Sequence, residues 1–300
     1  MTRDPTAQAD PPTARRVIEP TTIGPITFAW GARTYVMGIL NVTPDSFSGD
    51  GLLAADDPVA AAVAQARRMV DEGADLLDIG GESTRPGHRD VREADELARV
   101  VPVVAAVRAA LPRTPLTVDT TKAAVAAAAL DAGADALNDI WGVGPDDALA
   151  RLAATRGVPL IVMHNRAEPR YDDVVAEVVD DLRAAVERAV GAGVARESII
   201  VDPGIGFGKT PGQNLELLAG LGALTRLGRP VLLGTSRKST LGKVLDLPAD
   251  QRLEATLATT ALGIADGVDI VRVHDVEANI RAARMTDAIV RGTWREGATP

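Results

Sequence analysis

The chain contains no cysteine, which excludes disulfides, thiolate nucleophiles and metal sites with cysteine ligands. Aromatic residues make up only 3% of the 300 residues, whereas hydrophobic residues make up 46%. Small branched side chains must therefore fill the core, which suits the layered packing of a barrel. No apolar stretch approaches the roughly 20 residues that span a bilayer. We therefore expect a soluble, cytoplasmic protein with no membrane segment.

Clustered positive charge is also lacking. The formal net charge is −9, and no basic run occurs anywhere in the sequence. Because contacts to a phosphate backbone need clustered Lys and Arg, we expect no nucleic-acid partner. Net charge says little about a single pocket, so a local site for a small anion remains compatible with the composition.

The N-terminal segment differs in composition from the rest of the chain. Residues 1–24 are rich in Pro, Thr, Asp and Arg and contain no apolar signal region. We predict that this segment is a disordered tail and that residues 25–300 form one domain. The stretch Ile26 to Thr34, with Gly31 at its centre, resembles a short β-hairpin.

From there on, short Val-, Ile- and Leu-rich runs alternate with Ala-rich stretches of helical character. The runs that we predict as strands are Tyr35 to Leu40, Leu76 to Gly80, Leu116 to Asp119, Ala136 to Ile140, Pro159 to Met163, Ile199 to Asp202, Val231 to Gly234 and Ile270 to Val273. Apolar strands separated by helices are typical of a parallel sheet covered on both faces. Right-handed crossovers leave an open doubly wound sheet or a closed barrel. Eight units in a chain of this length favour a (β/α)₈ (TIM) barrel.

Three predicted helices end with a similar pattern. In residues 71–75, 131–135 and 265–269 a Gly is followed by one small residue and an Asp. The Gly can adopt the left-handed conformation that ends a helix and returns the chain to the next strand. The recurrence favours one repeated β/α unit.

Polar residues stand at or just after the end of each predicted strand. They are Asn41, Glu82-Ser83-Thr84-Arg85, Asp119, Asn138, His164, Asp202, Lys238, Arg272 and His274. A single such residue is usually a helix cap or a turn former. In a barrel, however, all of these strand ends meet at one mouth, where active sites are found.

These residues form two chemical sets. The first set offers donors to an anion and comprises Arg85, Lys238, Arg272 and His274, with Asn41 and Thr84 as neutral helpers. The second set is Asp119, Asn138 and Asp202, whose oxygens suit a ring with several N–H donors, such as an aminopyrimidinone. Together they predict a nitrogen heterocycle that carries a phosphate or diphosphate.

Two long loops, residues 41–51 and 80–87, contain many turn formers and are typical of mobile lids at a catalytic face. A third segment, Pro203 to Thr210, almost spells a phosphate-binding P-loop. Pro203 replaces its first glycine, and Asp202 would repel a phosphate. We interpret its glycines as allowing the backbone to approach a ligand, with Phe207 packing on it.

His164 is open to two interpretations. One is a base or a ligand, and the other is a residue that ties a strand end to a neighbouring loop. With three histidines in all and no paired spacing, a zinc site is not expected. Magnesium needs only one or two protein oxygens when diphosphate and water supply the rest.

The motifs in this order resemble those of the dihydropteroate synthases, the sulfonamide targets of folate biosynthesis. The similarity extends from about Met37 to Asp275. The segments that carry it are residues 37–48, 78–87, 118–120, 138–140, 202–209, 236–239 and 272–275. The resemblance implies an SN1-like displacement in which p-aminobenzoate replaces pyrophosphate on a dihydropterin.

The resemblance also implies roles for individual residues. The pterin would be held by Asp119, Asn138, Asp202 and Lys238, with Ile140 and Met163 lining its slot. The diphosphate would be bound with Mg²⁺ by Asn41, the metal ligand, and by Arg272 and His274, with Thr84 and Arg85 closing over it. The aminobenzoate would be bordered by Phe47, Phe207 and Ser239. A homodimer through the later barrel helices is implied as well.

The sequence departs from the family pattern at Asn165-Arg166-Ala167 and at Gly49-Asp50-Gly51. Both departures lie at the predicted mouth, although neither replaces a residue to which chemistry is assigned. Two other functions remain open. One is a pterin-binding methyltransferase that acts on a corrinoid, and the other is a relative that binds pterin or an anion without turnover.

Overall fold

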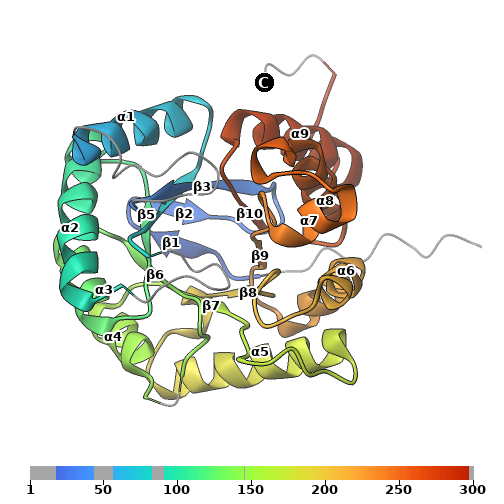
Figure 1. The fold of residues 1–300 in the computed structure, drawn as a ribbon, viewed down its shortest axis with the longest axis horizontal. Helices are drawn as coiled ribbons and strands as arrows, with labels where there is room; N and C mark the ends of the chain where they lie inside the picture. The colour runs from blue at the N-terminus through green and yellow to red at the C-terminus, as the bar shows by residue number, and fades with distance from the viewer. Residues whose placement is uncertain (1–17, 44–56, 83–90, 145, 297–300) are drawn as a thin grey trace, which may run out of the picture.

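The computed structural model describes residues 18–43, 57–82, 91–144 and 146–296. Eight parallel strands form an inner ring, and helices surround it (Figure 1). The strands are β3 (Tyr35–Asn41), β4 (Leu76–Gly80), β5 (Leu116–Asp119), β6 (Ala136–Asp139), β7 (Leu160–Met163), β8 (Ile199–Asp202), β9 (Leu232–Leu233) and β10 (Ile270–Val273). The helices are α1 (Pro58–Asp71), α2 (Glu93–Ala110), α3 (Ala123–Asp131), α4 (Ala148–Arg156), α5 (Val174–Gly191), α6 (Pro211–Ala219), α7 (Ser239–Leu245), α8 (Leu253–Ala265) and α9 (Val276–Val290).

The ring of strands is closed. The strand order is β8-β7-β6-β5-β4-β3-β10-β9. The two outer strands meet through a parallel bridge between Val201 and Val231, where the Val201 N–H donates to the Pro230 carbonyl at 2.9 Å. The predicted (β/α)₈ barrel is therefore confirmed. Four strands have the predicted bounds, whereas β9 is shorter than predicted.

Two layers of apolar side chains hold the barrel together. One layer lies between the strands and the surrounding helices and is made mostly of Val, Leu and Ala. The other fills the lower interior of the ring with strand residues such as Met37, Leu76 and Ile161, none of which is exposed. These inward-facing residues make the lower interior a packed core, so a ligand has room only above them.

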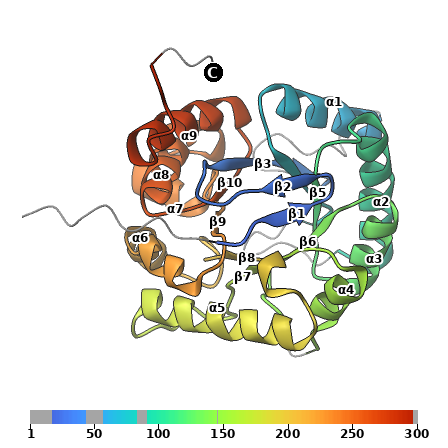
Figure 2. The same ribbon diagram turned by 180° about the vertical axis from the view of Figure 1, so that it is seen from behind.

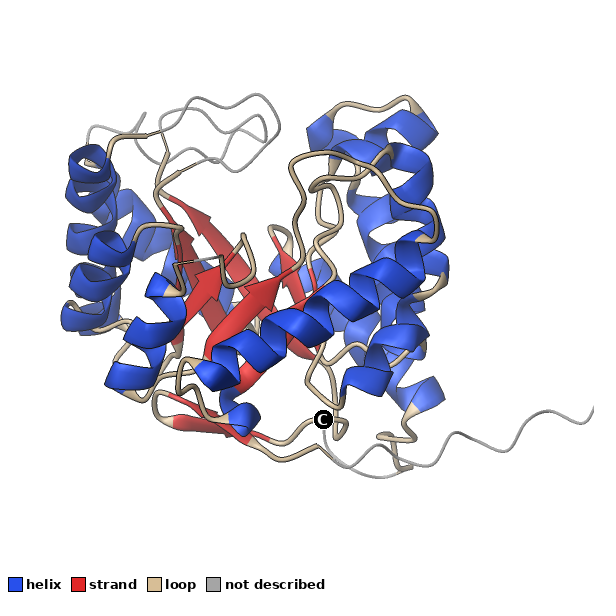
Figure 3. Ribbon diagram, turned by 90° about the horizontal axis from the view of Figure 1, so that it is seen from below, coloured by secondary structure: helices blue, strands red, loops and turns tan. Residues whose placement is uncertain are grey.

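The N-terminal hairpin covers the lower opening of this core. It consists of β1 (Thr21–Ile23) and β2 (Ile26–Phe28), paired antiparallel beneath the ring (Figures 2 and 3). Phe28 stacks on Trp30 and contacts the edge of Tyr35, with ring centroids 5.4 and 4.8 Å apart. This aromatic cluster closes the N-terminal end of the barrel.

The predicted hairpin is present, but it begins earlier than Ile26. Residues 18–24, which we assigned to a disordered tail, contain β1 and bury Ile18 and Ile23, so that part of the prediction is wrong. The β-branched residues 21–23 pair across a turn at Gly24, whose φ is +54°. Residues 1–17 lie outside the described residues. Within the described ranges, none of the helices combines the length and the apolar character needed to span a bilayer.

Candidate active site

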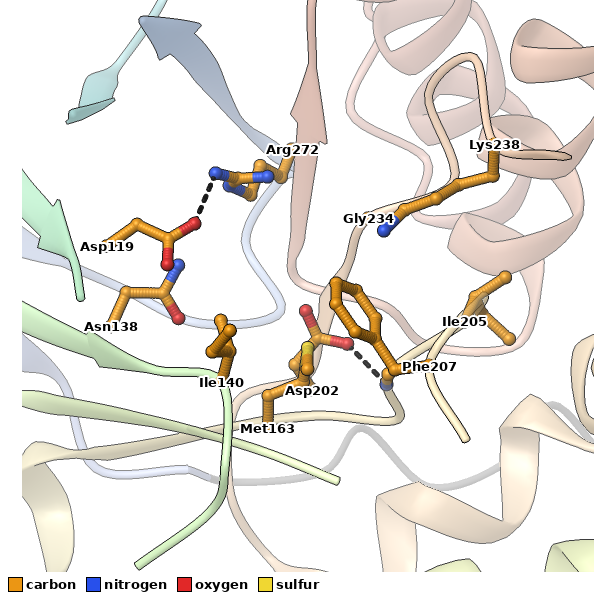
Figure 4. A pocket seen from close by; sticks show the side chains of 11 residues that line it. Asp119, Asn138, Ile140, Met163, Asp202, Ile205, Phe207, Gly234, Lys238 and Arg272 are labelled. Atoms are coloured by element: carbon orange, nitrogen blue, oxygen red, sulfur yellow. Dashed lines mark hydrogen bonds and ion pairs between the residues drawn. The ribbon is translucent and has the colours of Figure 1, made fainter. Parts of the chain in front are cut away.

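The upper end of the barrel, at the C-terminal ends of the strands, contains a narrow slot (Figure 4). Its lining residues include Asp119, Asn138, Ile140, Met163, Asp202, Phe207, Lys238 and Arg272. The slot opens into a wider mouth, which Asn41, Ser239 and His274 help to line. The structure thus brings eleven of the predicted site residues together. Phe47, Thr84 and Arg85 lie outside the described residues.

Asp78 lies beneath the slot and was missed as a site residue. It stands in the middle of β4 and is 0% exposed. Its Oδ2 accepts hydrogen bonds from Arg272 Nε at 2.6 Å and Asn138 Nδ2 at 3.0 Å, and the Thr117 hydroxyl donates to its Oδ1. Asp78 lies inside β4, so the pattern of polar residues at strand ends does not include it. The available signal was a lone Asp inside an apolar strand, because a buried carboxylate requires partners.

The contact with Asp78 sets the orientation of Asn138. Asn138 Nδ2 donates to Asp78 Oδ2, so the amide nitrogen of Asn138 faces Asp78. The amide oxygen then faces the slot, as Figure 4 shows. Asn138 therefore presents an acceptor to a ligand.

Asp119 and Asp202 present two more acceptors. Asp119 receives a hydrogen bond from Arg272 Nη2 at 2.9 Å on Oδ2, and its buried Oδ1 has no partner among the described residues. Burial raises the pKa of Asp119 to about 7, against the opposing effect of Arg272. Burial also raises the pKa of Asp202, whose Oδ1 accepts the Gly204 N–H at 2.7 Å. The slot therefore suits a ring with several N–H donors.

Positive groups flank these acceptors. Arg272 joins Asp78 and Asp119, and although burial lowers its pKa, the charges of these carboxylates raise it above the ordinary value. The Lys238 ammonium lies 4.0 Å from the centroid of the Phe207 ring, so that both side chains border the slot (Figure 4). At the mouth, His274 Nδ1 lies 2.9 Å from the Ser236 hydroxyl oxygen. The arrangement combines an acceptor-rich slot with donors suited to an anion.

His164 does not line either space among the described residues. Its Nε2 lies 3.0 Å from Asp181 Oδ2, and its Nδ1 lies 2.9 Å from Lys209 Nζ. Burial, aided by the charge of Lys209, lowers the pKa of His164 to about 4. Both ring nitrogens are thus engaged and the imidazole is neutral. Of the two interpretations, the geometry supports a tie between a strand end and a neighbouring loop.

The departure at Asn165-Arg166-Ala167 also has a structural account. Arg166 donates to Asp181 at 2.8 Å and to Glu177 at 2.7 Å, and its guanidinium lies 4.4 Å from the centroid of the Tyr171 ring. These contacts fasten the segment to α5. The departure at residues 49–51 lies outside the described residues.

Residues 37–274 match the sequence model of a family described as pterin binding enzyme. The chain is 50% identical over 270 residues to the dihydropteroate synthase of Clostridium beijerinckii, covering 90% of this chain and 99% of the relative. The chain belongs to the dihydropteroate synthase family. It is also 49% identical over 266 residues to the dihydropteroate synthase of Bacillus subtilis, covering 89% and 92% of the two chains.

Solved structures of the family have the same fold. A dihydropteroate synthase from Clostridium difficile, determined in the presence of pteroic acid, has a TM-score of 0.83 and 50% identity, covering 87% of this chain and 98% of that one. The Burkholderia cenocepacia enzyme complexed with 7,8-dihydropteroate has a TM-score of 0.80 and 42% identity, covering 91% and 97%.

Proposed function

We propose that the protein condenses 6-hydroxymethyl-7,8-dihydropterin pyrophosphate with p-aminobenzoate to give 7,8-dihydropteroate and pyrophosphate, as a transferase of folate biosynthesis. The observation that carries the proposal is the slot in which Asp119, Asn138 and Asp202 present acceptors next to Arg272 and Lys238. A dihydropterin offers ring and amino N–H donors to such acceptors. Family membership gives the reaction class.

The slot is also suited to the flat shape of the pterin. Ile140 and Met163 are nearly fully buried and line the slot next to the three acceptors. Apolar contacts of this kind hold a flat ring, while the few polar groups set its orientation. Lys238 would contact the ring from the side of Phe207.

The acceptors also suit the charge that develops during the reaction. The methylene C–O bond breaks first, and its electron pair leaves with pyrophosphate. The resulting cation is delocalised into the pterin, where the carboxylates of Asp119 and Asp202 stabilise it. The amine of p-aminobenzoate then forms the C–N bond and releases a proton to solvent. Because an aniline nitrogen is already a neutral nucleophile, the reaction does not require His164 as a base.

The diphosphate would be held at the wider mouth by Asn41, Arg272 and His274. Arg272 uses Nε and Nη2 in its two ion pairs, and neither pair uses Nη1. Thr84 and Arg85 would close over the diphosphate. At the same mouth, Phe207 and Ser239, with Phe47, would border the aminobenzoate.

Magnesium fits this donor set. Asn41 ends β3 and lines the mouth with an amide side chain. Among the described residues, no three His, Asp or Glu side chains are grouped to hold a metal ion. Mg²⁺ commonly uses one or two protein oxygens and completes its shell with phosphate oxygens and water. Bound beside Asn41, Mg²⁺ would neutralise charge on the leaving diphosphate.

A homodimer through the later helices is also part of the proposal. Leu262 on α8 and Met285 and Ile289 on α9 are 66%, 62% and 70% exposed, and α8 packs against α9. Large apolar side chains gathered on neighbouring helices support an interface between protein surfaces. The cytoplasmic location stays a prediction.

The test is to incubate the purified protein with Mg²⁺, dihydropterin pyrophosphate and p-aminobenzoate and to measure dihydropteroate and released pyrophosphate. We expect product from the wild type and a loss of at least about 100-fold in Asp202→Ala and in Lys238→Ala, because each removes a charged contact. Circular dichroism checks that both variants fold. Folded wild-type protein that binds pterin without forming product would instead indicate the non-catalytic relative or the methyltransferase.

A further inference from the structure

Lys209 lies at the wall of the site, and neither the strand-end pattern nor the reaction gives it a role. It lies in the loop that links β8 to α6 and helps to line the wider mouth. Its ammonium nitrogen lies 3.0 Å from the Gly204 carbonyl oxygen, 3.0 Å from the Phe207 carbonyl oxygen and 2.9 Å from His164 Nδ1. Three acceptors therefore converge on one nitrogen.

This geometry requires the charged form of the lysine. An ammonium has three N–H donors, whereas a neutral amine has two and would leave one acceptor without a partner. Nδ1 of the neutral imidazole is an acceptor because the Asp181 carboxylate accepts from Nε2–H, which fixes the tautomer. Asp181 is itself held by Arg166 at 2.8 Å. The contacts form a chain from Asp181 through His164 to Lys209.

The loop held by Lys209 is tightly folded. Gly204 and Gly208 have φ values of +67° and +53°, a conformation that side chains disfavour. A Cβ at Gly204 would lie 1.9 Å from the His164 carbonyl oxygen, and one at Gly208 would lie 2.2 Å from the Arg166 carbonyl oxygen. The backbone of the loop thus packs closely against the segment that follows β7. The Lys209 ammonium donates to the carbonyl oxygens of two residues of this loop, Gly204 and Phe207.

The same loop surrounds two residues of the slot. The Gly204 N–H donates to Asp202 Oδ1 at 2.7 Å, and Phe207 lies beneath the Lys238 ammonium. The charge of Lys209 also acts directly on Asp202 by opposing the rise in pKa that burial causes. Lys209 therefore influences both the shape and the charge of the slot without being one of the residues that line it.

We propose that Lys209 is a positioning residue of the pterin slot, whose ammonium, held by Gly204, Phe207 and His164, orders the loop that carries Phe207 and the Gly204 N–H that donates to Asp202. This inference rests on the proposed pterin-binding function. It assigns His164 to the support of Lys209 rather than to contact with substrate.

The first test is equilibrium binding of 6-hydroxymethyl-7,8-dihydropterin pyrophosphate with Mg²⁺, together with KM and kcat. In Lys209→Met we expect the dissociation constant and KM for the pterin to rise about 10- to 100-fold, the size of a lost charged hydrogen bond. The KM for p-aminobenzoate changes less. The matched control is Arg226→Met, which removes a positive charge from an exposed position and leaves the pterin constants unchanged.

A pair of variants at His164 separates support of Lys209 from packing. The side-chain oxygen of His164→Asn replaces the acceptor at Nδ1, whereas His164→Leu has no acceptor. We expect His164→Asn to stay within about threefold of wild-type pterin affinity and His164→Leu to lose about tenfold or more, as for a lost charged hydrogen bond. Equal affinities in the two variants would contradict the proposal. This pair also tests it if Lys209→Met does not fold.

The pH profile of pterin binding gives an independent readout. The titratable and charged groups around Lys209 are Asp202 on β8, Lys238 after β9, and His164, Arg166 and Asp181 from the region of β7 and α5. Loss of the ammonium raises the pKa of Asp202 further, so we expect the acid limb to move to higher pH in Lys209→Met. Burial lowers the pKa of Lys209 to about 7. Wild-type affinity should therefore fall above this pH, and that fall should be absent in the variant.

The outcomes distinguish the two proposals. If wild-type protein neither binds the pterin nor forms dihydropteroate, the proposed function fails. If the wild type is active but Lys209→Met keeps its pterin affinity and its acid limb, Lys209 is not a positioning residue. A variant with lower thermal stability but unchanged affinity would likewise assign Lys209 to folding alone.

Discussion

The two ends of the barrel use the same side chain in opposite ways. At the N-terminal ends of the strands, Asp75, Asp135 and Asp269 each accept the backbone N–H of a neighbouring strand, at 2.8, 2.8 and 3.0 Å. At the C-terminal ends, Asp119 keeps one buried oxygen without a partner in the described part of the chain, and Asp202 faces the slot. Carboxylates whose hydrogen bonds are all made within the protein stabilise the fold, whereas carboxylates with an oxygen available to a ligand form the site.

The surroundings of each end account for this difference. The lower Asp residues belong to the repeated helix endings, where Gly73, Gly133 and Gly267 have φ values of +105°, +113° and +95°. This short return brings each Asp next to the neighbouring strand, and the hairpin closes the space below. At the upper end the described residues leave a slot open between Asp119, Asn138 and Asp202. A buried polar group without a partner is costly, so we expect it where a ligand completes it.

The largest effect is expected at Asp78, the support of the slot. In Asp78→Ala, the mostly buried Arg272 loses the closer of its two carboxylate partners. We expect a loss of about 3–5 kcal/mol in the free energy of unfolding, the usual cost of breaking a buried ion pair. Activity should fall at least about 100-fold because Arg272 and Asn138 lose their orientation. Urea denaturation and steady-state kinetics measure both losses, and near-wild-type activity would contradict this role.

Asp119→Asn should weaken function and yet stabilise the protein at high pH. Burial raises the pKa of Asp119 to about 7 from 3.8, so the folded state retains a proton that the unfolded chain loses. The stability due to this carboxyl is complete below pH 3.8 and is lost as the pH rises through about 7. Relative to wild type, the variant should gain about 1–3 kcal/mol between pH 5 and pH 8. Unfolding free energies at the two pH values, with pterin affinity, check this, and a pH-independent difference would refute it.

Asp135→Ala, at the lower end of the barrel, should lower stability without changing activity. It leaves the Leu116 N–H without its carboxylate and removes the ion pair with Arg108. We expect a loss of about 1–3 kcal/mol in the free energy of unfolding. The kcat/KM of the folded fraction should stay at the wild-type value, because the slot lies at the other end. A fall in kcat/KM without unfolding would show that the two ends are coupled.

The smallest effect is expected when a charge is removed from the surface. Glu187 pairs with Arg196 at 2.7 Å, but both side chains are about half exposed. Glu187→Gln should change the free energy of unfolding far less than Asp135→Ala does and leave activity unchanged, because solvent screens an exposed ion pair. Measured by the same urea denaturation, Glu187→Gln serves as the reference against which the loss in Asp135→Ala is judged. A larger loss of unfolding free energy in Glu187→Gln than in Asp135→Ala would contradict the expected difference between buried and exposed carboxylates.

Most of the fold was predictable because the repeated pattern of apolar strands and Ala-rich helices is local. The bounds of β4, β5, β8 and β10 agree with the prediction to the residue. The hairpin was placed too late because its first strand has only three residues in a polar segment. Strand β9 has only two residues, and Gly234, which we predicted as its last residue, lines the slot instead.

The site was predictable only in part. Asp119, Asn138 and Asp202 follow from their positions at strand ends, and all three line the slot. Asp78 was missed because it is recognisable only from its contacts with strands far away in the sequence. Lys209 was read only as part of an imperfect P-loop, and its three acceptors come from two separate loops.

By itself the sequence determined the barrel, the family and the two chemical sets at its mouth, because each depends on local periodicity or on motifs in order. Only the tertiary structure decided which groups remain available to a ligand. The amide of Asn138 is oriented by Asp78, and both nitrogens of His164 are engaged by Lys209 and Asp181. Whether a polar group is satisfied depends on which partners the closed barrel brings within hydrogen-bonding distance, and local sequence patterns do not specify those distances.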